Sequence, residues 1–115
     1  MATPTLLAAN NYGASLKDHN SFEEARLLLR KTIPVARRVL GDSHRITLTM
    51  RLFCARALYE DEGATFDDVR EAVTTLDDAE RTARRVLGGA HPDTVDIEQS
   101  LRYARDTLRA RETRA

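Results

Sequence analysis

The sequence predicts an all-α fold in which antiparallel helices stack as repeated pairs. A segment of 13 residues occurs twice, as ARRVLGDSHRITL at 36–48 and as ARRVLGGAHPDTV at 83–95, an offset of 47 residues. Between these copies, apolar residues recur every three or four positions, which is the spacing of one face of a helix. Repetition at a period of this size is typical of stacked supersecondary units. No segment predicts a strand, so the chain is expected to be a helical array.

A weaker copy of the same segment precedes both, because residues 5–6 match residues 47–48. The chain is therefore interpreted as two full units and the opening of a third. The predicted unit boundaries are approximately 3–44, 45–91 and 92–115. A chain of 115 residues suits one domain, 1–115, and a domain of this size can bury a core without a disulfide or a metal.

Unit one is expected to hold two helices, the first with an apolar face between Leu6 and Leu16. The second should span about 22–40, where Ser21 followed three residues later by Glu24 predicts a capping box. Gly41 should end this helix, because glycine tolerates the left-handed conformation that follows many helix ends. Pro34 predicts a kink or a local break within it.

Unit two repeats this plan, with a helix from Thr47 to about Glu62 and another from about Phe66 to Leu87. Gly88-Gly89 should stop that helix, and a fifth helix should start near Asp93. The predicted total is five helices. Among the residues expected to face inward are Val39, Val86 and Val95.

Charge and composition narrow the function classes. Lys plus Arg is 18 and Asp plus Glu is 18, which argues against a generic binder of nucleic acid or anionic membranes. No apolar run approaches the ~20 residues of a membrane span, and the N-terminus lacks a basic leader, so a cytoplasmic protein is expected. Cys54 is the single cysteine and is expected to be buried.

The candidate chemical groups point away from catalysis. His44 and His91 occupy equivalent places in two units, and each is expected to hydrogen-bond a helix end rather than to bind zinc. The acidic pairs 67–68 and 77–78 are interpreted as favourable charge at a helix N-terminus and as solvated surface. Because no triad order, phosphate loop or HExxH motif occurs, we predict no enzyme, no cofactor and no metal.

Two further patterns carry a resemblance to a known family. Small residues alternate with larger ones where paired helices must approach, an order that resembles a tetratricopeptide repeat. The small residues are Gly13, Ala25, Thr32, Ala55, Ala72 and Ala79. The segments after 38 and 85, VLGDSH and VLGGAHPDTV, resemble the LG-x-x-H-P-x-T-L linker of kinesin-light-chain-type repeats. Asn10-Asn11 matches the asparagine pair that opens many such units.

This resemblance implies a right-handed α-solenoid of about two and a half repeats. Unit two departs from the pattern, because Leu52-Phe53 replaces the asparagine pair and about five extra residues lie around 63–68. Unit three has only its first helix, and Arg102 stands where a small residue is expected. Arg102 fits a solvated outer face, so the fifth helix is expected to cap the stack.

The resemblance also implies that the first helix of each unit lines a concave groove. The side-chain amides of asparagine and glutamine there can hydrogen-bond the backbone of an extended peptide. Arg56 and Lys17 can pair with acidic side chains of the peptide, and the tyrosines add apolar contact area. The projected positions are Asn10, Ala14, Lys17, Leu52, Arg56, Tyr59, Gln99, Tyr103 and Asp106. The predicted function is a scaffold that docks a protein partner's peptide or helix in this groove.

Two alternatives come from other functional classes. The chain could be an assembly module, either a homodimer or a piece of a longer array, with Leu52 and Phe53 as contact residues. It could also bind nucleic acid through the arginine-rich segment from Arg102 to Arg114, although acidic residues balance the overall charge.

Overall fold

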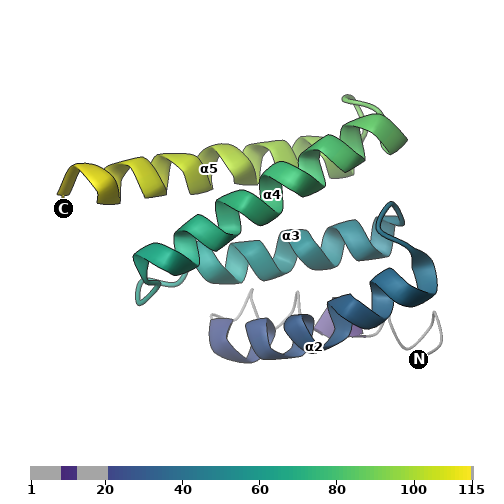
Figure 1. Cartoon of the computed structure of the whole chain (residues 1–115), viewed down its shortest axis with the longest axis horizontal. Helices are drawn as coiled ribbons and strands as arrows, with labels where there is room; N and C mark the ends of the chain where they lie inside the picture. The colour runs from purple at the N-terminus through teal and green to yellow at the C-terminus, as the bar shows by residue number, and fades with distance from the viewer. Residues whose placement is uncertain (1–8, 13–20, 115) are drawn as a thin grey trace.

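The computed structural model describes residues 9–12 and 21–114. In this part of the chain every regular element is a helix, which confirms the all-α prediction. Residues 9–12 are helical, and the labelled helices are α2 (Phe22–Leu40), α3 (Arg45–Tyr59), α4 (Phe66–Leu87) and α5 (Pro92–Arg114). The chain reverses direction at each turn from α2 to α5, so successive helices run antiparallel (Figure 1).

The helices form a stack rather than a closed bundle. α2 packs on α3, α3 on α4, and α4 on α5. The backbones of α2 and α4 do not pack against each other, and the side chains of Arg30 and Glu71 bridge the space between them. α3 also contacts α5, so the first helices of units two and three lie side by side. This pattern of neighbour contacts is typical of a helical repeat array.

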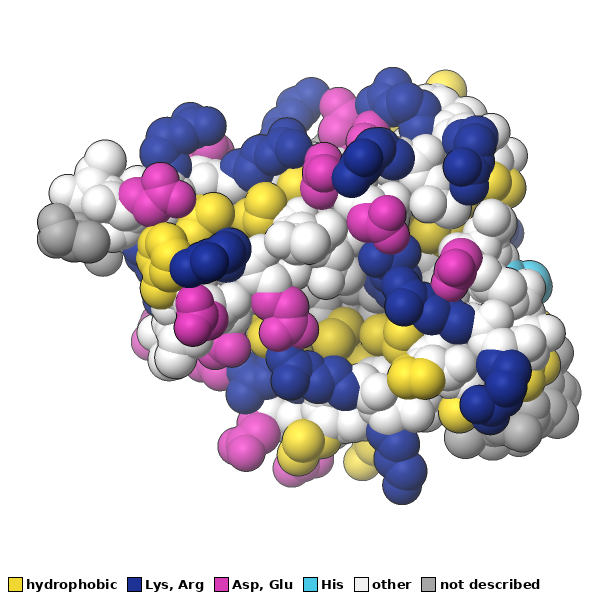
Figure 2. Space-filling model, in the orientation of Figure 1, with side chains coloured by type: hydrophobic (Ala, Val, Ile, Leu, Met, Phe, Trp, Pro, Cys, Tyr) yellow, Lys and Arg dark blue, Asp and Glu magenta, His cyan; other side chains and the backbone are white. Residues whose placement is uncertain are grey.

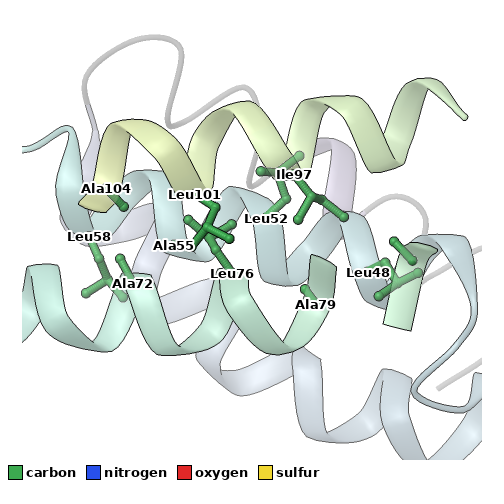
Figure 3. Packing of buried hydrophobic residues seen from close by; sticks show 11 residues of the cluster. Leu48, Leu52, Ala55, Leu58, Ala72, Leu76, Ala79, Ile97, Leu101 and Ala104 are labelled. Carbon is green, nitrogen blue, oxygen red and sulfur yellow. The ribbon is translucent and has the colours of Figure 1, made fainter. Parts of the chain in front are cut away.

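The 47-residue repetition of the sequence appears again in the packing of the core. One hydrophobic cluster joins α2 to α3, and a second joins α3, α4 and α5, whose side chains point toward one another (Figure 3). Equivalent positions make equivalent contacts in the two clusters. The first contains Leu29, Ala36, Met50 and Cys54, and the second contains their counterparts Leu76, Ala83, Ile97 and Leu101.

α3 lies at the centre of this arrangement and buries more than one face. Leu52 is only 3% exposed and packs toward α4 and α5. Phe53 is half-buried and packs against both clusters. The two apolar residues that depart from the repeat pattern therefore fill space between helices. Leu52 is therefore not available as the contact residue that the assembly interpretation required, whereas Phe53 keeps part of its surface exposed.

α5 exposes the face that α3 buries. Leu48, Leu52, Ala55 and Leu58 of α3 lie in the core cluster. Their counterparts 47 positions later are Val95, Gln99, Arg102 and Arg105, all exposed. The prediction that Arg102 lies on a solvated face is confirmed, and α5 lacks the apolar face with which α3 holds its second helix.

Two glycines end α2 and α4 in the same way. Gly41 has φ 92° and ψ 161°, and Gly88 has φ 91° and ψ 155°. The predicted positive φ is confirmed, but the ψ values place both residues in an extended mirror-image region rather than in the left-handed helical one. That region is adopted almost only by glycine, so the backbone itself requires glycine after these helices.

The capping box appears at a different helix from the predicted one. Ser21 has ψ 59° instead of extended backbone, and its side chain makes no cap bond to α2. At α4, the Thr65 hydroxyl accepts from the Asp68 amide at 3.1 Å, and the Asp68 carboxylate accepts from the Thr65 amide at 3.0 Å. A reciprocal cap thus fixes the start of α4.

Other predictions also need correction. Of the kink or local break predicted at Pro34, the break does not occur, because α2 continues through this residue. The ribbon of α2 does change direction part-way, as a kink would require (Figure 1). α3 spans Arg45–Tyr59, starting and ending earlier than expected. Val39 and Val86 are 46% and 47% exposed, because in the last turns of α2 and α4 the following leucines pack inward instead. Val95 is 36% exposed, since no helix covers that side of α5 in the described chain.

Candidate functional site

A cavity of about 330 Å³ lies between α3 and α5. These are the first helices of consecutive units, and the cavity lies where they contact each other. The lining residues are Arg56, Tyr59, Glu60, Asp96, Gln99, Ser100 and Tyr103. Four of them are among the residues proposed from sequence, and they come from two separate helices.

A second hollow, of about 420 Å³, continues along α5 and is lined by Gln99, Arg102, Tyr103 and Asp106. It shares Gln99 and Tyr103 with the first cavity. We call the two together the α3–α5 groove. Asp106, the fifth predicted residue to reach this surface, lies in its second part.

The two tyrosines of the groove differ in exposure. Tyr59 is half-buried, and burial raises the pKa of its phenol, while the neighbouring Ser100 acts in the opposite direction. Tyr103 is 68% exposed. An exposed aromatic ring with a polar tip is a common anchor in protein recognition.

The arginines of the groove are already engaged by carboxylates. Arg56 Nε lies 3.0 Å from Glu60 Oε1, and Arg102 Nη2 lies 2.8 Å from Glu98 Oε1. The expected role of Arg56 as a partner for acidic peptide side chains is therefore weakened by an intramolecular ion pair.

Two predicted groove residues lie elsewhere, and two are not described. Leu52 belongs to the core, as described above. Asn10 is 6% exposed, and its Nδ2 donates to Thr49 Oγ1 at 3.0 Å. It therefore ties the first helical segment to α3 instead of facing solvent. Lys17 and Ala14 lie outside the described residues.

Sequence reasoning missed four members of the groove, which are Glu60, Asp96, Ser100 and Arg102. Asp96 lies three residues before Gln99 and seven before Tyr103, so helical spacing places all three on one stripe. That spacing could have identified Asp96. Glu60 follows the last residue of α3. The predicted helix ended at about Glu62, so the sequence did not show that Glu60 lies at the helix end beside the groove.

The linker histidines act as predicted. His44 Nδ1 accepts from the Ile46 amide at 3.1 Å, and His91 Nδ1 accepts from the Asp93 amide at 3.0 Å. Each ring nitrogen thus satisfies an amide at the start of α3 or α5. Among the described residues, no group of three or more His, Cys, Asp or Glu side chains is arranged to hold a metal ion.

The acidic pairs of α4 have different roles. Asp67 and Asp68 lie in its first turn, as expected, and the Thr65 amide bonded to Asp68 lowers the pKa of that carboxyl. Asp77 and Asp78 are not merely solvated. Asp77 pairs with Arg105 of α5 at 3.1 Å, so this acidic side chain links two helices.

A hollow on another face lies between α2 and α4, where the surface view shows apolar atoms surrounded by charged side chains (Figure 2). Arg30 Nη2 bridges it, donating to both Glu71 carboxylate oxygens at 2.9 Å. Cys54 is among its lining residues and is buried and reduced, which confirms the expected burial. Burial raises the pKa of the Cys54 thiol, so this cysteine is not an activated nucleophile.

Four arginines of α5 that were proposed for nucleic-acid binding make intramolecular contacts. Arg102 and Arg105 pair with acidic residues as described above, and Arg109 Nη1 lies 3.8 Å from Asp106. Arg111 donates to the Ala64 carbonyl oxygen in the α3–α4 turn. Part of the positive charge of these arginines therefore already interacts with groups of the protein itself.

Comparison with known proteins identifies one segment of the chain. Residues 5–46 match the family model described as Tetratricopeptide repeat. This tetratricopeptide match covers nearly all of the predicted first unit, 3–44, and ends at the second residue of α3. No curated protein and no solved structure matches the chain. In the described residues, none of the helices has the length and apolarity needed to cross a membrane.

Proposed function

We propose that this chain is a protein-interaction scaffold that docks a peptide or helix of a partner protein in the α3–α5 groove. The observation that carries the proposal is the groove itself. Residues from two consecutive first helices line one surface, and Tyr103 is 68% exposed within it. Tetratricopeptide repeats generally mediate protein–protein interaction, and the match at 5–46 supports the same role here.

We also propose that the units are of the kinesin-light-chain-like type. The support is the linker, where both copies combine a positive-φ glycine with a histidine that caps the next helix. Gly41 precedes His44 by three residues, and Gly88 precedes His91 by the same interval. Enzymatic activity is not expected from a scaffold of this kind, and its absence stays a prediction.

A random peptide library displayed on phage provides the test. A selected peptide should lose at least tenfold in affinity when Arg56→Ala and Tyr103→Ala are combined, because the double variant removes side chains from both walls of the groove. Affinity would be measured by fluorescence anisotropy, and circular dichroism would verify that the variant keeps its helical content.

The matched control is Arg85→Ala, which removes an exposed arginine from α4, outside the groove. It should leave the affinity unchanged. If selection yields no binding peptide, or if the double variant binds as tightly as the original chain, the groove proposal is wrong.

A further inference from the structure

In the α3–α5 groove, the cationic and the acidic side chains differ in whether they form close ion pairs within the described residues. Both cationic residues of its lining, Arg56 and Arg102, already pair with carboxylates at 3.0 Å or less. Asp96 has no ion-pair partner in the part of the chain that the structure describes. Among the described residues, the ion-pair partner of Asp106 is Arg109, at 3.8 Å, and both side chains are more than 70% exposed. The groove therefore offers negative charge to an incoming ligand.

These two aspartates flank the exposed aromatic ring. Asp96, Gln99, Tyr103 and Asp106 follow one another at intervals of three and four residues, which places them on one stripe of α5. Asp96 and Asp106 are ten residues apart, a rise of about 15 Å along a helix. An extended peptide covers that distance in about four or five residues.

We propose that the groove selects an extended basic peptide, with two lysine or arginine side chains four or five residues apart. Each cation meets one aspartate, and the segment between them crosses Tyr103, whose ring face also attracts cations. Gln99 offers an amide to the peptide backbone between the two charges. This inference rests on the proposed function, and it reverses the acidic ligand expected from Arg56 in the sequence.

Defined peptides test the charge preference. The probe is a nonapeptide of alanine and serine with blocked ends and lysine at its third and seventh positions, which an extended chain presents on the same face. Its two matched counterparts carry glutamate or glutamine at those positions. Chemical-shift titration of the ¹⁵N-labelled chain measures weak affinities and shows which amides respond. The lysine peptide should bind more tightly than both counterparts, shift amides of α3 and α5, and weaken as salt rises.

A second experiment replaces both aspartates of the groove. Asp96→Asn with Asp106→Asn should lower the affinity for the lysine peptide by about three- to tenfold, as for two exposed ion pairs, and should leave the glutamine peptide unaffected. The control, Glu23→Gln with Asp67→Asn, removes the same charge from α2 and α4. It should change the affinity for the lysine peptide little, which separates a local effect from net charge.

The failures of the two proposals are distinguishable. If library-selected peptides depend on Arg56 and Tyr103 but the lysine peptide binds no better than the glutamate peptide, the groove stands and its basic preference is wrong. An unchanged affinity in the double asparagine variant would also overturn the preference. If no selected or defined peptide binds, the groove proposal fails with it.

Discussion

The Arg51 guanidinium of α3 lies 2.8 Å from the carboxylate of Asp78 in α4. The Arg51 side chain is only 7% exposed, whereas that of Asp78 is 57% exposed. An arginine is thus held among the packed helices by an acidic residue at the surface, and Arg51 also donates to the Thr75 carbonyl oxygen at 3.5 Å.

Asp78→Asn should destabilise the fold, because it leaves the buried Arg51 cation without its counter-charge. We expect a loss of about 1–2 kcal/mol, below the cost of breaking a fully buried pair, since solvent screens Asp78. Urea unfolding followed by circular dichroism would measure it. Glu62→Gln removes an exposed charge in the α3–α4 turn and is the control. Equal free energies of unfolding for the two variants would contradict this role of the ion pair.

Acid should weaken the fold through the same pair. The hydrogen bond from Arg51 lowers the pKa of Asp78 below its ordinary value of 3.8. The resulting stabilisation is present above that value and is lost as the pH falls through the folded-state pKa. The free energy of unfolding should therefore fall below about pH 4, and less steeply in Asp78→Asn than in the original chain. Parallel curves for the two proteins would rule out a contribution from Asp78.

Gly88→Ala should destabilise the chain through backbone strain alone. The new Cβ would meet no atom within 4 Å, but φ is +91°, in a region that costs other residues about 1–3 kcal/mol. Gly63→Ala is the matched control, because its Cβ would lie at an ordinary 3.5 Å from Asp61. Thermal unfolding of both variants checks the difference. A Gly88→Ala variant as stable as Gly63→Ala would show that the linker relaxes.

Two equivalent threonines offer a change that should not destabilise the fold. Thr47 and Thr94 are 0% exposed, and their hydroxyl oxygens have no hydrogen-bond partner among the described residues. Thr94→Val replaces an unsatisfied hydroxyl with a methyl group, so we expect stability unchanged or raised by up to about 1 kcal/mol.

Thr94→Ser provides the contrast, because it keeps the hydroxyl and removes the methyl group. It should lower stability by about 1 kcal/mol. Both variants would be measured by urea unfolding. A Thr94→Val variant less stable than Thr94→Ser would mean that the hydroxyl is satisfied after all.

Interactions between residues close together in the chain made much of the fold predictable. The bounds of α2 and α4 follow from apolar spacing and from the glycines that stop each helix. The linker histidines could be assigned to helix ends because they recur at the same place in two units. Part of the groove was predictable for a related reason. Tyr59, Gln99 and Tyr103 lie on helical stripes that a repeat pattern can project.

The sequence by itself determined the helical period, the 47-residue repetition and the residues that end the helices, because these depend on neighbours along the chain. Only the tertiary structure decided which faces of α3 are buried, which arginines are paired and which carboxylates remain available. Those outcomes depend on contacts between helices far apart in sequence. Leu52 therefore joins the core although its position in the repeat pointed to the groove, and Asp96 has no ion-pair partner among residues 9–12 and 21–114 although nothing beside it in the chain indicates this.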